Sequence, residues 1–239
     1  MSTSDPQRTA TRAEWLEARK QLLAREKELT HLREEIAAER RALPWVAVEN
    51  DYVFDTEKGR ATLAELFAGR GQLLVYHFMF PASWEAGCKS CSFWADGYDG
   101  IQAHLAARDV RLVAISKAPL AQLLGFRERM GWSFPWVSSA SNDFNRDFAV
   151  SFTPDELATK ARVYNFGTQP FGVEEAPGIS VFAKDAAGSV FRTYSCYSRG
   201  LDMLNPTYQL LDLVPKGRAE TGLAYPMGWV RLHDEYESS

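Results

Sequence analysis

The sequence lacks three features: a set of paired cysteines, a long hydrophobic run and a strong excess of charge of one sign. Three cysteines in 239 residues are too few, and odd in number, for a disulfide-stapled secreted domain. No run approaches the roughly 18 apolar residues of a membrane-spanning helix, and the first residues lack the basic and apolar regions of a secretory signal. The net charge of −4 is spread along the chain and gives no electrostatic case for nucleic acid. We therefore expect a cytoplasmic protein that binds neither nucleic acid nor membrane.

The N-terminal part is expected to form one long helix. Residues 11–42 contain neither glycine nor proline, and Pro44 follows them as a helix terminator. A narrow apolar seam recurs at every seventh position: Trp15, Leu22, Leu29, Ile36 and Leu43. The positions three residues later are too polar for a strict two-stranded coiled coil. We expect this seam to pack on its own domain or on the partner subunit of a homodimer.

Two cysteines lie where a buried strand meets a helix. The run Leu73–Phe80 is unbroken, apolar and rich in branched and aromatic residues, which is typical of a strand that is buried on both faces. A loop leads from it to Cys88 and Cys91. The helix is indicated by apolar residues at the spacing of one helix face: Cys91, Trp94, Tyr98, Ile101 and Leu105. Both thiols are therefore predicted at the start of a helix.

This position favours redox chemistry at Cys88 and Cys91. Unpaired N–H groups and the helix dipole favour a thiolate in the first helical turn, so Cys88 is predicted to be the nucleophile. Cys91, on the apolar side, would resolve the mixed disulfide. Two alternatives stay open, half of a zinc site or plain buried residues. Zinc needs four ligands, and the chain offers only Cys196 and four histidines without a second CxxC. We expect neither a metal nor a cofactor.

The rest of the chain alternates strands and helices. The pattern predicts strands at 52–54, 111–116 and 133–139, helices at 61–67, 119–130 and 201–213, and a hairpin of 179–182 with 189–194. Periodicity between 147 and 177 is too weak for an assignment. The division expected is an N-terminal helical extension (1–45), a mixed α/β domain (46–215) and a C-terminal tail packing on it (216–239).

The order of these elements resembles the thioredoxin fold: strand, CxxC at a helix start, strand, helix, proline before a hairpin, final helix. Six segments are also similar to a bacterial thioredoxin-like family whose function is not established. These are ELTHLREEIAAERRALPWV (28–46), VYHFMFPASWEAGCKSCSFWAD (75–96), RMGWSFPWVSS (129–139), FNRDFAVSF (144–152), PGISVF (177–182) and PMGWVRLHDEY (226–236). The resemblance implies a three-layer α/β sandwich with a central mixed sheet.

Two better understood relatives can be compared with the residues around Cys88. Pro81 lies seven residues before it, similar to the PxxxTxxC loop of peroxiredoxins, but Glu85 stands at the threonine position. Peroxiredoxins also hold their thiolate with an arginine just before a late strand, where this chain has Ala176-Pro177-Gly178. Pro177 instead resembles the cis-proline that thioredoxins place opposite their CxxC, where a substrate strand docks. The resemblance thus favours a disulfide over a peroxide as substrate.

Four residues are predicted to support the two cysteines, each with a plainer interpretation beside it. Pro177 would open the docking groove. Trp84 would shape the docking surface or belong to the core, and Glu85 would accept a proton or only face solvent. Lys89 would favour the thiolate or only face solvent. Two residues outside this set, His77 and Cys196, are expected in the core. The distance along the chain from Cys88 to Cys196 is nevertheless one at which peroxiredoxins sometimes keep a resolving cysteine.

Two classes of function remain after this comparison. The first is a thiol–disulfide oxidoreductase that acts on a disulfide or an oxidised thiol, with proteins among the candidate substrates. A peroxiredoxin-like thiol peroxidase is the alternative within that class. The second is a non-enzymatic thioredoxin-fold module for binding or dimerisation, because a fold alone does not specify chemistry. The CxxC pair favours the oxidoreductase.

Overall fold

The computed structural model describes residues 9–159, 164–169 and 171–237, and the chain divides into two compact units, Met1–Pro44 and Trp45–Ser239. The first unit contains helix α1 (Arg12–Ala42). Thr11 caps it, because its side chain accepts the Glu14 N–H while the Glu14 carboxylate accepts the Thr11 N–H. The predicted long helix is confirmed. The predicted boundary after residue 215 stays a prediction.

The apolar seam of α1 is exposed. The helix has no buried residue, and Trp15, Leu22 and Leu29 are 60%, 54% and 48% exposed. Soluble proteins seldom leave so long an apolar stripe uncovered, so the expected packing of the seam stays a prediction. No helix within the described ranges has the length and apolar character needed to cross a bilayer.

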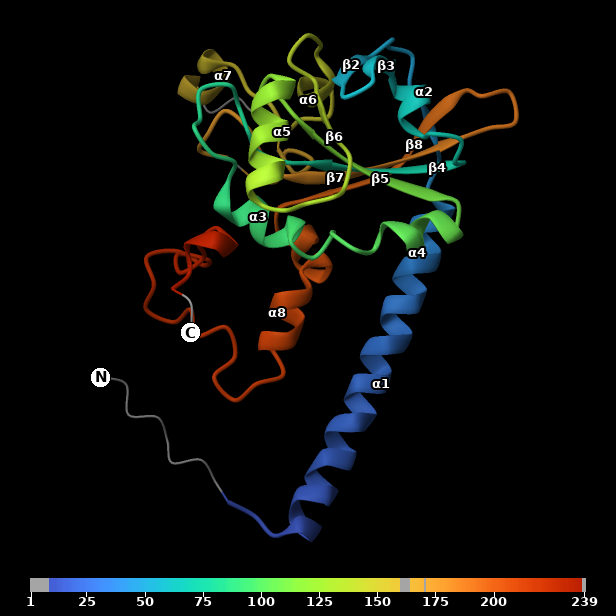
Figure 1. Ribbon diagram of the computed structural model, residues 1–239. Helices are drawn as coiled ribbons and strands as arrows, with labels where there is room; N and C mark the ends of the chain where they lie inside the picture. The colour runs from blue at the N-terminus through green and yellow to red at the C-terminus, as the bar shows by residue number, and fades with distance from the viewer. Residues whose placement is uncertain (1–8, 160–163, 170, 238–239) are drawn as a thin grey trace. The chain divides into compact units, whose positions relative to one another are not determined.

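The second unit is built on one mixed sheet (Figure 1). In the described residues its eight strands are β1 (Val46–Ala47), β2 (Val53–Thr56), β3 (Gly59–Thr62), β4 (Gln72–His77), β5 (Val110–Ser116), β6 (Trp136–Ser138), β7 (Gly178–Lys184) and β8 (Val190–Tyr197). They lie in the order β1-β8-β7-β4-β5-β6-β2-β3. Strands β4, β5 and β6 are parallel and the other pairs antiparallel. The predicted strand 73–80 is confirmed only in its first part, as the central strand β4, which ends at His77.

Helices cover both faces of this sheet. They are α2 (Leu63–Leu66), α3 (Lys89–Ala95), α4 (Gln102–Ala107), α5 (Leu120–Arg129), α6 (Phe144–Asp147), α7 (Pro154–Thr159) and α8 (Pro206–Leu211), with the 3₁₀ helices η1 (Ser198–Leu204) and η2 (His233–Glu235). On one face, α3, α5 and α8 pack with Tyr76 of β4 in one apolar cluster. On the other, α2 and α6 pack with Leu73 and Val75. Side chains alternate along the strand, so the two clusters make the three layers that were predicted.

The element order confirms the thioredoxin-like fold class. Strand β4 leads to the two cysteines at the start of α3, and β5 and α5 follow. Pro177 then directly precedes the antiparallel hairpin of β7 and β8, and α8 comes after it. Within the sheet, β4 lies between its parallel neighbour β5 and its antiparallel neighbour β7. This arrangement brings the start of α3 next to the segment before β7.

Two predicted helices are broken in the structure. The helix face predicted over 91–105 is divided between α3 and α4, because the chain turns between them and Gly100 has a φ of +79°. A Cβ on Gly97 would lie 2.5 Å from Cγ of Pro206, so this turn packs directly on α8. The helix predicted over 201–213 is divided at Asn205, whose extended backbone (ψ 102°) is the conformation favoured before a proline.

Two shorter predictions are shifted. The strand predicted at 52–54 is β2, and it pairs with β3, which includes Ala61 of the predicted helix 61–67. Thr62 and Glu65 form a reciprocal capping box, so the helix α2 begins only at Leu63. The predicted strand 133–139 is confirmed only in its centre, as β6.

The C-terminal segment folds back onto the same apolar cluster as α3 and α8. Val230 and Leu232 are buried in it. The Glu220 carboxylate accepts the Met227 backbone N–H at 2.8 Å and the Trp229 indole N–H at 2.9 Å. These contacts fix the segment beside α3 and make it a wall of the site described next.

Candidate active site

The loop before α3 places Cys88 at the helix start. The Cys88 N–H donates to the Met79 carbonyl at 3.1 Å, and Cys88 is the N-cap residue of α3. A Cβ on Gly87 would lie 2.7 Å from the Phe78 ring and 2.8 Å from the Phe126 ring. Glycine is therefore needed immediately before Cys88, since any side chain would push the loop away from the core.

The two thiols form an asymmetric pair. Cys88 is partly buried and Cys91 is buried, and both are free thiols. The Cys91 N–H donates to Cys88 Sγ at 3.4 Å. Donation by the Cys91 thiol, opposed by burial and assisted by the N–H groups of Cys91 and Ser90, lowers the pKa of Cys88 from 9.0 to about 7. Burial, and then the neighbouring Cys88, raise the pKa of Cys91 well above 9.0.

The alkylation rate of Cys88 is expected to rise with pH around a midpoint of about 7, because the thiolate is the reacting form. Iodoacetamide labelling between pH 5 and 10, with the Cys88 peptide quantified by mass spectrometry, measures it. The matched variant Cys91→Ala removes the strongest donor to the thiolate, so its midpoint should move upward. A wild-type midpoint close to 9.0 would contradict the assignment of Cys88 as the activated thiol.

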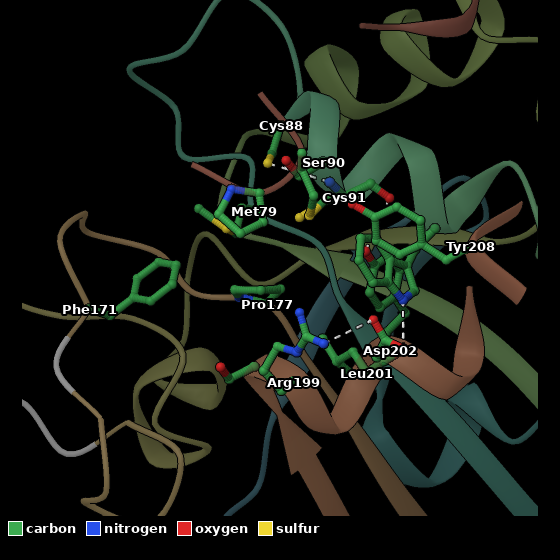
Figure 2. Close-up of a pocket in the computed structure, with 15 residues that line it drawn as sticks. Met79, Cys88, Ser90, Cys91, Phe171, Pro177, Arg199, Leu201, Asp202 and Tyr208 are labelled. Carbon is green, nitrogen blue, oxygen red and sulfur yellow. Dashed lines mark hydrogen bonds and ion pairs between the residues drawn. The ribbon is translucent and has the colours of Figure 1, made fainter. Parts of the chain in front are cut away.

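A pocket of about 350 Å³ opens beside this pair. Figure 2 shows its residues, which come from β4 and the loop after it, α3, the segment before β7, η1, α8 and the C-terminal segment. The lining includes Cys88, Cys91, Pro177, Leu201, Tyr208 and Met227. Most lining side chains are apolar or aromatic, which is typical of small-molecule sites. The pocket gives a ligand direct access to the thiol with the lowered pKa.

Of the four supporting residues predicted from the sequence, Pro177 lines this pocket and the other three lie outside its lining. Trp84 is partly buried against the edge of the core, and its carbonyl accepts a hydrogen bond from Gln122. Glu85 is exposed on the loop, and Lys89 is partly exposed at the first position of α3. The structure therefore brings Cys88, Cys91 and Pro177 together.

The surroundings of Pro177 differ from what the thioredoxin resemblance implied. Among the described residues no peptide bond is cis, so the bond from Ala176 to Pro177 is trans. The Ala176 N–H donates to the Val150 carbonyl at 2.8 Å, and the Pro177 carbonyl accepts the Tyr164 hydroxyl at 2.8 Å. Two backbone groups with which a substrate strand would pair are thus already occupied.

His77 and Cys196 both lie in the core. His77 Nε2 is 2.8 Å from Ser180 Oγ, and burial lowers the pKa of His77 to about 3, so the imidazole is neutral at pH 7. Cys196 is buried on β8 and does not line the pocket. In the described ranges no three His, Cys, Asp or Glu side chains gather as a metal ion would require.

Several pocket residues were not predicted from the sequence. Ser90 lies between the two cysteines, and its N–H and hydroxyl both help to lower the pKa of Cys88. The sequence signal that could have identified Ser90 was its position between the two cysteines of CKSC. Tyr76 could have been inferred from the alternation of side chains along β4. Its hydroxyl donates to the Cys91 carbonyl at 3.1 Å. Arg199 and Met227 come from segments more than 100 residues further along the chain, where no local pattern marks them.

The geometry can be set beside known proteins. The model of DUF899, a family of bacterial proteins of unknown function, matches residues 4–236. The chain belongs to this family. The match confirms the bacterial family of unknown function that the six segments resemble. A search of curated proteins found no match.

Solved structures similar to this family member include peroxiredoxins with low sequence identity. The peroxidoxin BcpB from Mycobacterium tuberculosis is 17% identical, with a TM-score of 0.44 over 70% of this chain and 96% of that one. A cysteine-to-serine mutant of peroxiredoxin Q from Xanthomonas campestris is 12% identical, with a TM-score of 0.48 over 71% and 97%. The mitochondrial 2-cys peroxiredoxin from Plasmodium falciparum is 11% identical, with a TM-score of 0.40 over 70% and 93%.

Proposed function

We propose that this DUF899 protein is a thiol–disulfide oxidoreductase with Cys88 as nucleophile and Cys91 as resolving thiol. The observation that carries the proposal is the asymmetry of the pair. Cys88 borders an open pocket and has a pKa lowered to about 7, whereas Cys91 is buried, has a raised pKa and lies within hydrogen-bonding reach. A nucleophile with a pKa near the ambient pH is the most effective attacking thiol.

The proposed reaction transfers two electrons from the protein to the substrate. The Cys88 thiolate attacks one sulfur of R–S–S–R, a Cys88–S–R bond forms, and one R–S⁻ leaves. Cys91 then gives its proton to this leaving thiolate and attacks the Cys88 sulfur, which releases the second R–S⁻ and forms the Cys88–Cys91 disulfide. An external dithiol must reduce that disulfide before the next turnover.

Reduction of organic disulfides is expected to be much faster than reduction of hydrogen peroxide. Cleavage of peroxide releases hydroxide, whose negative charge must be stabilised by a positioned hydrogen-bond donor and a cation. Glu85 and Pro177 stand where peroxiredoxins have the threonine and the arginine that do this. The lost stabilisation is on the order of a few kcal/mol. The measurement compares kcat/KM for both substrates with dithiothreitol as reductant, corrected for the uncatalysed rate. Faster peroxide turnover would favour a thiol peroxidase, and turnover of neither substrate would favour a binding module.

We further propose that the protein is a homodimer in which the α1 seam is covered by the α1 of a second copy. The seam is narrower than that of a strict two-stranded coiled coil, and the charges that flank it support a parallel pair. Acidic residues precede basic ones by five positions, the spacing at which facing side chains of parallel helices form ion pairs. The pairs are Glu28 with Arg33, and Glu35 with Arg40. A reducing cytoplasm as the compartment stays a prediction.

Reversing the charge of Arg33 and Arg40 to glutamate is expected to weaken the dimer at least about tenfold, because each attraction becomes a repulsion in both symmetry-related contacts. Light scattering coupled to size-exclusion chromatography measures the mass over a dilution series. The matched control adds Glu28→Arg and Glu35→Arg, which should restore the dimer. A wild-type chain that is monomeric at every concentration would exclude the seam as a self-association surface.

A further inference from the structure

The pocket beside Cys88 has the dimensions of a small-molecule site. Its volume of about 350 Å³ lies in the range of roughly 300–1,000 Å³ that small ligands occupy. Three of its walls are apolar, with Trp94 from α3, Leu201 from η1 and Met227 from the C-terminal segment. Trp94 is fixed in this wall, since its indole N–H donates to the Leu201 carbonyl at 2.8 Å. The pocket is therefore a preformed apolar cavity that ends at a reactive thiol.

The backbone beside this pocket is poorly suited to binding a peptide strand. Docking of an extended peptide depends on N–H and C=O groups that are not already paired. Here residues 150–152 of the same chain already pair with the backbone just before Pro177. The Ala176 N–H donates to the Val150 carbonyl, and the Phe152 N–H donates to the Glu174 carbonyl, both at 2.8 Å. The Pro177 carbonyl is paired with Tyr164. Recognition must therefore come from the pocket's side chains.

Among the lining residues, all of which lie in the described ranges, Arg199 provides the cation. Its guanidinium is 3.9 Å from the Asp202 carboxylate. That carboxylate is bound more closely by Arg218, whose two terminal nitrogens donate to its two oxygens at 2.7 and 3.0 Å. Arg218 also binds the Asp212 carboxylate, at 2.8 and 2.7 Å, so its single charge is shared between the two acids. Asp202 keeps its two hydrogen bonds from Arg218 when Arg199 turns away, and the exposed Arg199 can then pair with a ligand. In the view of Figure 2, Pro177 lies between the two thiols and Arg199.

We propose that the substrate is a low-molecular-weight organic disulfide with an apolar body and an anionic group, which pairs with Arg199 while the sulfur reaches Cys88. This inference rests on the proposed oxidoreductase function and names its substrate class. The thiolate attack and the release of R–S⁻ follow the balanced steps given above, with a dithiol as final reductant. Arg199 determines specificity and does not take part in bond breaking.

The test uses two chromogenic aromatic disulfides, anionic 5,5′-dithiobis(2-nitrobenzoate) and neutral 2,2′-dithiodipyridine, with the full-length chain. Arg199→Gln is expected to lower kcat/KM at least about tenfold for the anionic disulfide, as loss of a charge-assisted contact does. For the neutral disulfide the change should be less than about twofold. The control Arg231→Gln removes an exposed charge outside the pocket lining and should change neither rate.

The outcomes separate the two proposals. Equal slowing of both disulfides by Arg199→Gln, or no slowing of either, would overturn the role of Arg199 while leaving the oxidoreductase function in place. A disulfide-bonded peptide turned over faster than both reagents would overturn the small-molecule class. If the wild-type protein reacts with neither reagent faster than free cysteine does, the proposed function itself fails.

Discussion

Replacing Cys88 by serine is expected to lower kcat/KM for disulfide reduction at least about 10³-fold, because a serine hydroxyl is not ionised near neutral pH. No other thiol can take its place. Cys91 is buried with a pKa raised well above 9.0, and Cys196 is buried outside the pocket lining. The measurement follows thiol release from an aromatic disulfide with dithiothreitol as reductant, with the rate without protein subtracted.

The Cys91→Ser variant is the matched comparison, because its hydroxyl can still donate to the Cys88 thiolate. It should react once and then stop as a Cys88–S–R mixed disulfide, visible as a mass increase of one R–S group. Slow release of this adduct by dithiothreitol then limits turnover. Steady turnover by the Cys88→Ser variant, or no adduct on the Cys91→Ser variant, would contradict the assigned roles.

The part of the site that could be predicted from the sequence is the part built from local pattern. The apolar run at 73–80 indicated a buried strand because a strand in the middle of a sheet is covered on both faces. The structure has β4 there, between two neighbouring strands. The position of Cys88 at a helix start followed from the helical spacing of the apolar residues after it. Both features depend on neighbours within about twenty residues.

The predicted helix over 91–105 shows where periodicity fails. Side chains of α3 and Leu105 of α4 contact the same apolar cluster, so the apolar spacing continues across the break between them. At the break Gly100 has a φ of +79°, and Gly97 packs against Pro206, a residue 109 positions later. Such a contact leaves no mark on the local pattern, although the two glycines at 97 and 100 weaken a helix.

The pocket could not be predicted for the same reason. Arg199 and Met227 meet Cys88 only because the chain folds η1 and the C-terminal segment around α3. The trans bond before Pro177 and the pairing of Ala176 with Val150 also depend on the weakly periodic region 147–177. Pro177 lines the same pocket as the cysteines, but the thioredoxin resemblance implied a substrate strand where the chain's own segment already pairs.

The position of the thiols depends on the aromatic core beneath them. The Met79 carbonyl accepts the Cys88 N–H, and the Met79 backbone acts to lower the pKa of Cys91 against the larger effect of burial. The preceding Phe78 is held by Trp136, with ring centroids 4.6 Å apart. The Phe78 carbonyl accepts the Ser116 hydroxyl at 2.6 Å, and the same hydroxyl accepts the Trp136 indole N–H at 3.0 Å. Trp136 therefore links core packing to the geometry of the site.

Replacing Trp136 by alanine is expected to lower the free energy of unfolding by about 3–5 kcal/mol, the usual cost of removing a large buried aromatic side chain. Trp136 is 1% exposed, so the cavity cannot be filled by solvent without disrupting the core. At roughly 2–4 °C per kcal/mol for a chain of this size, the melting temperature should fall by roughly 6–20 °C. Urea unfolding followed by circular dichroism measures the loss, with Trp45→Ala as the matched control. Trp45 is 52% exposed, and its removal should cost no more than about 1 kcal/mol. Equal losses for the two variants would show that Trp136 does not support the core as its burial indicates.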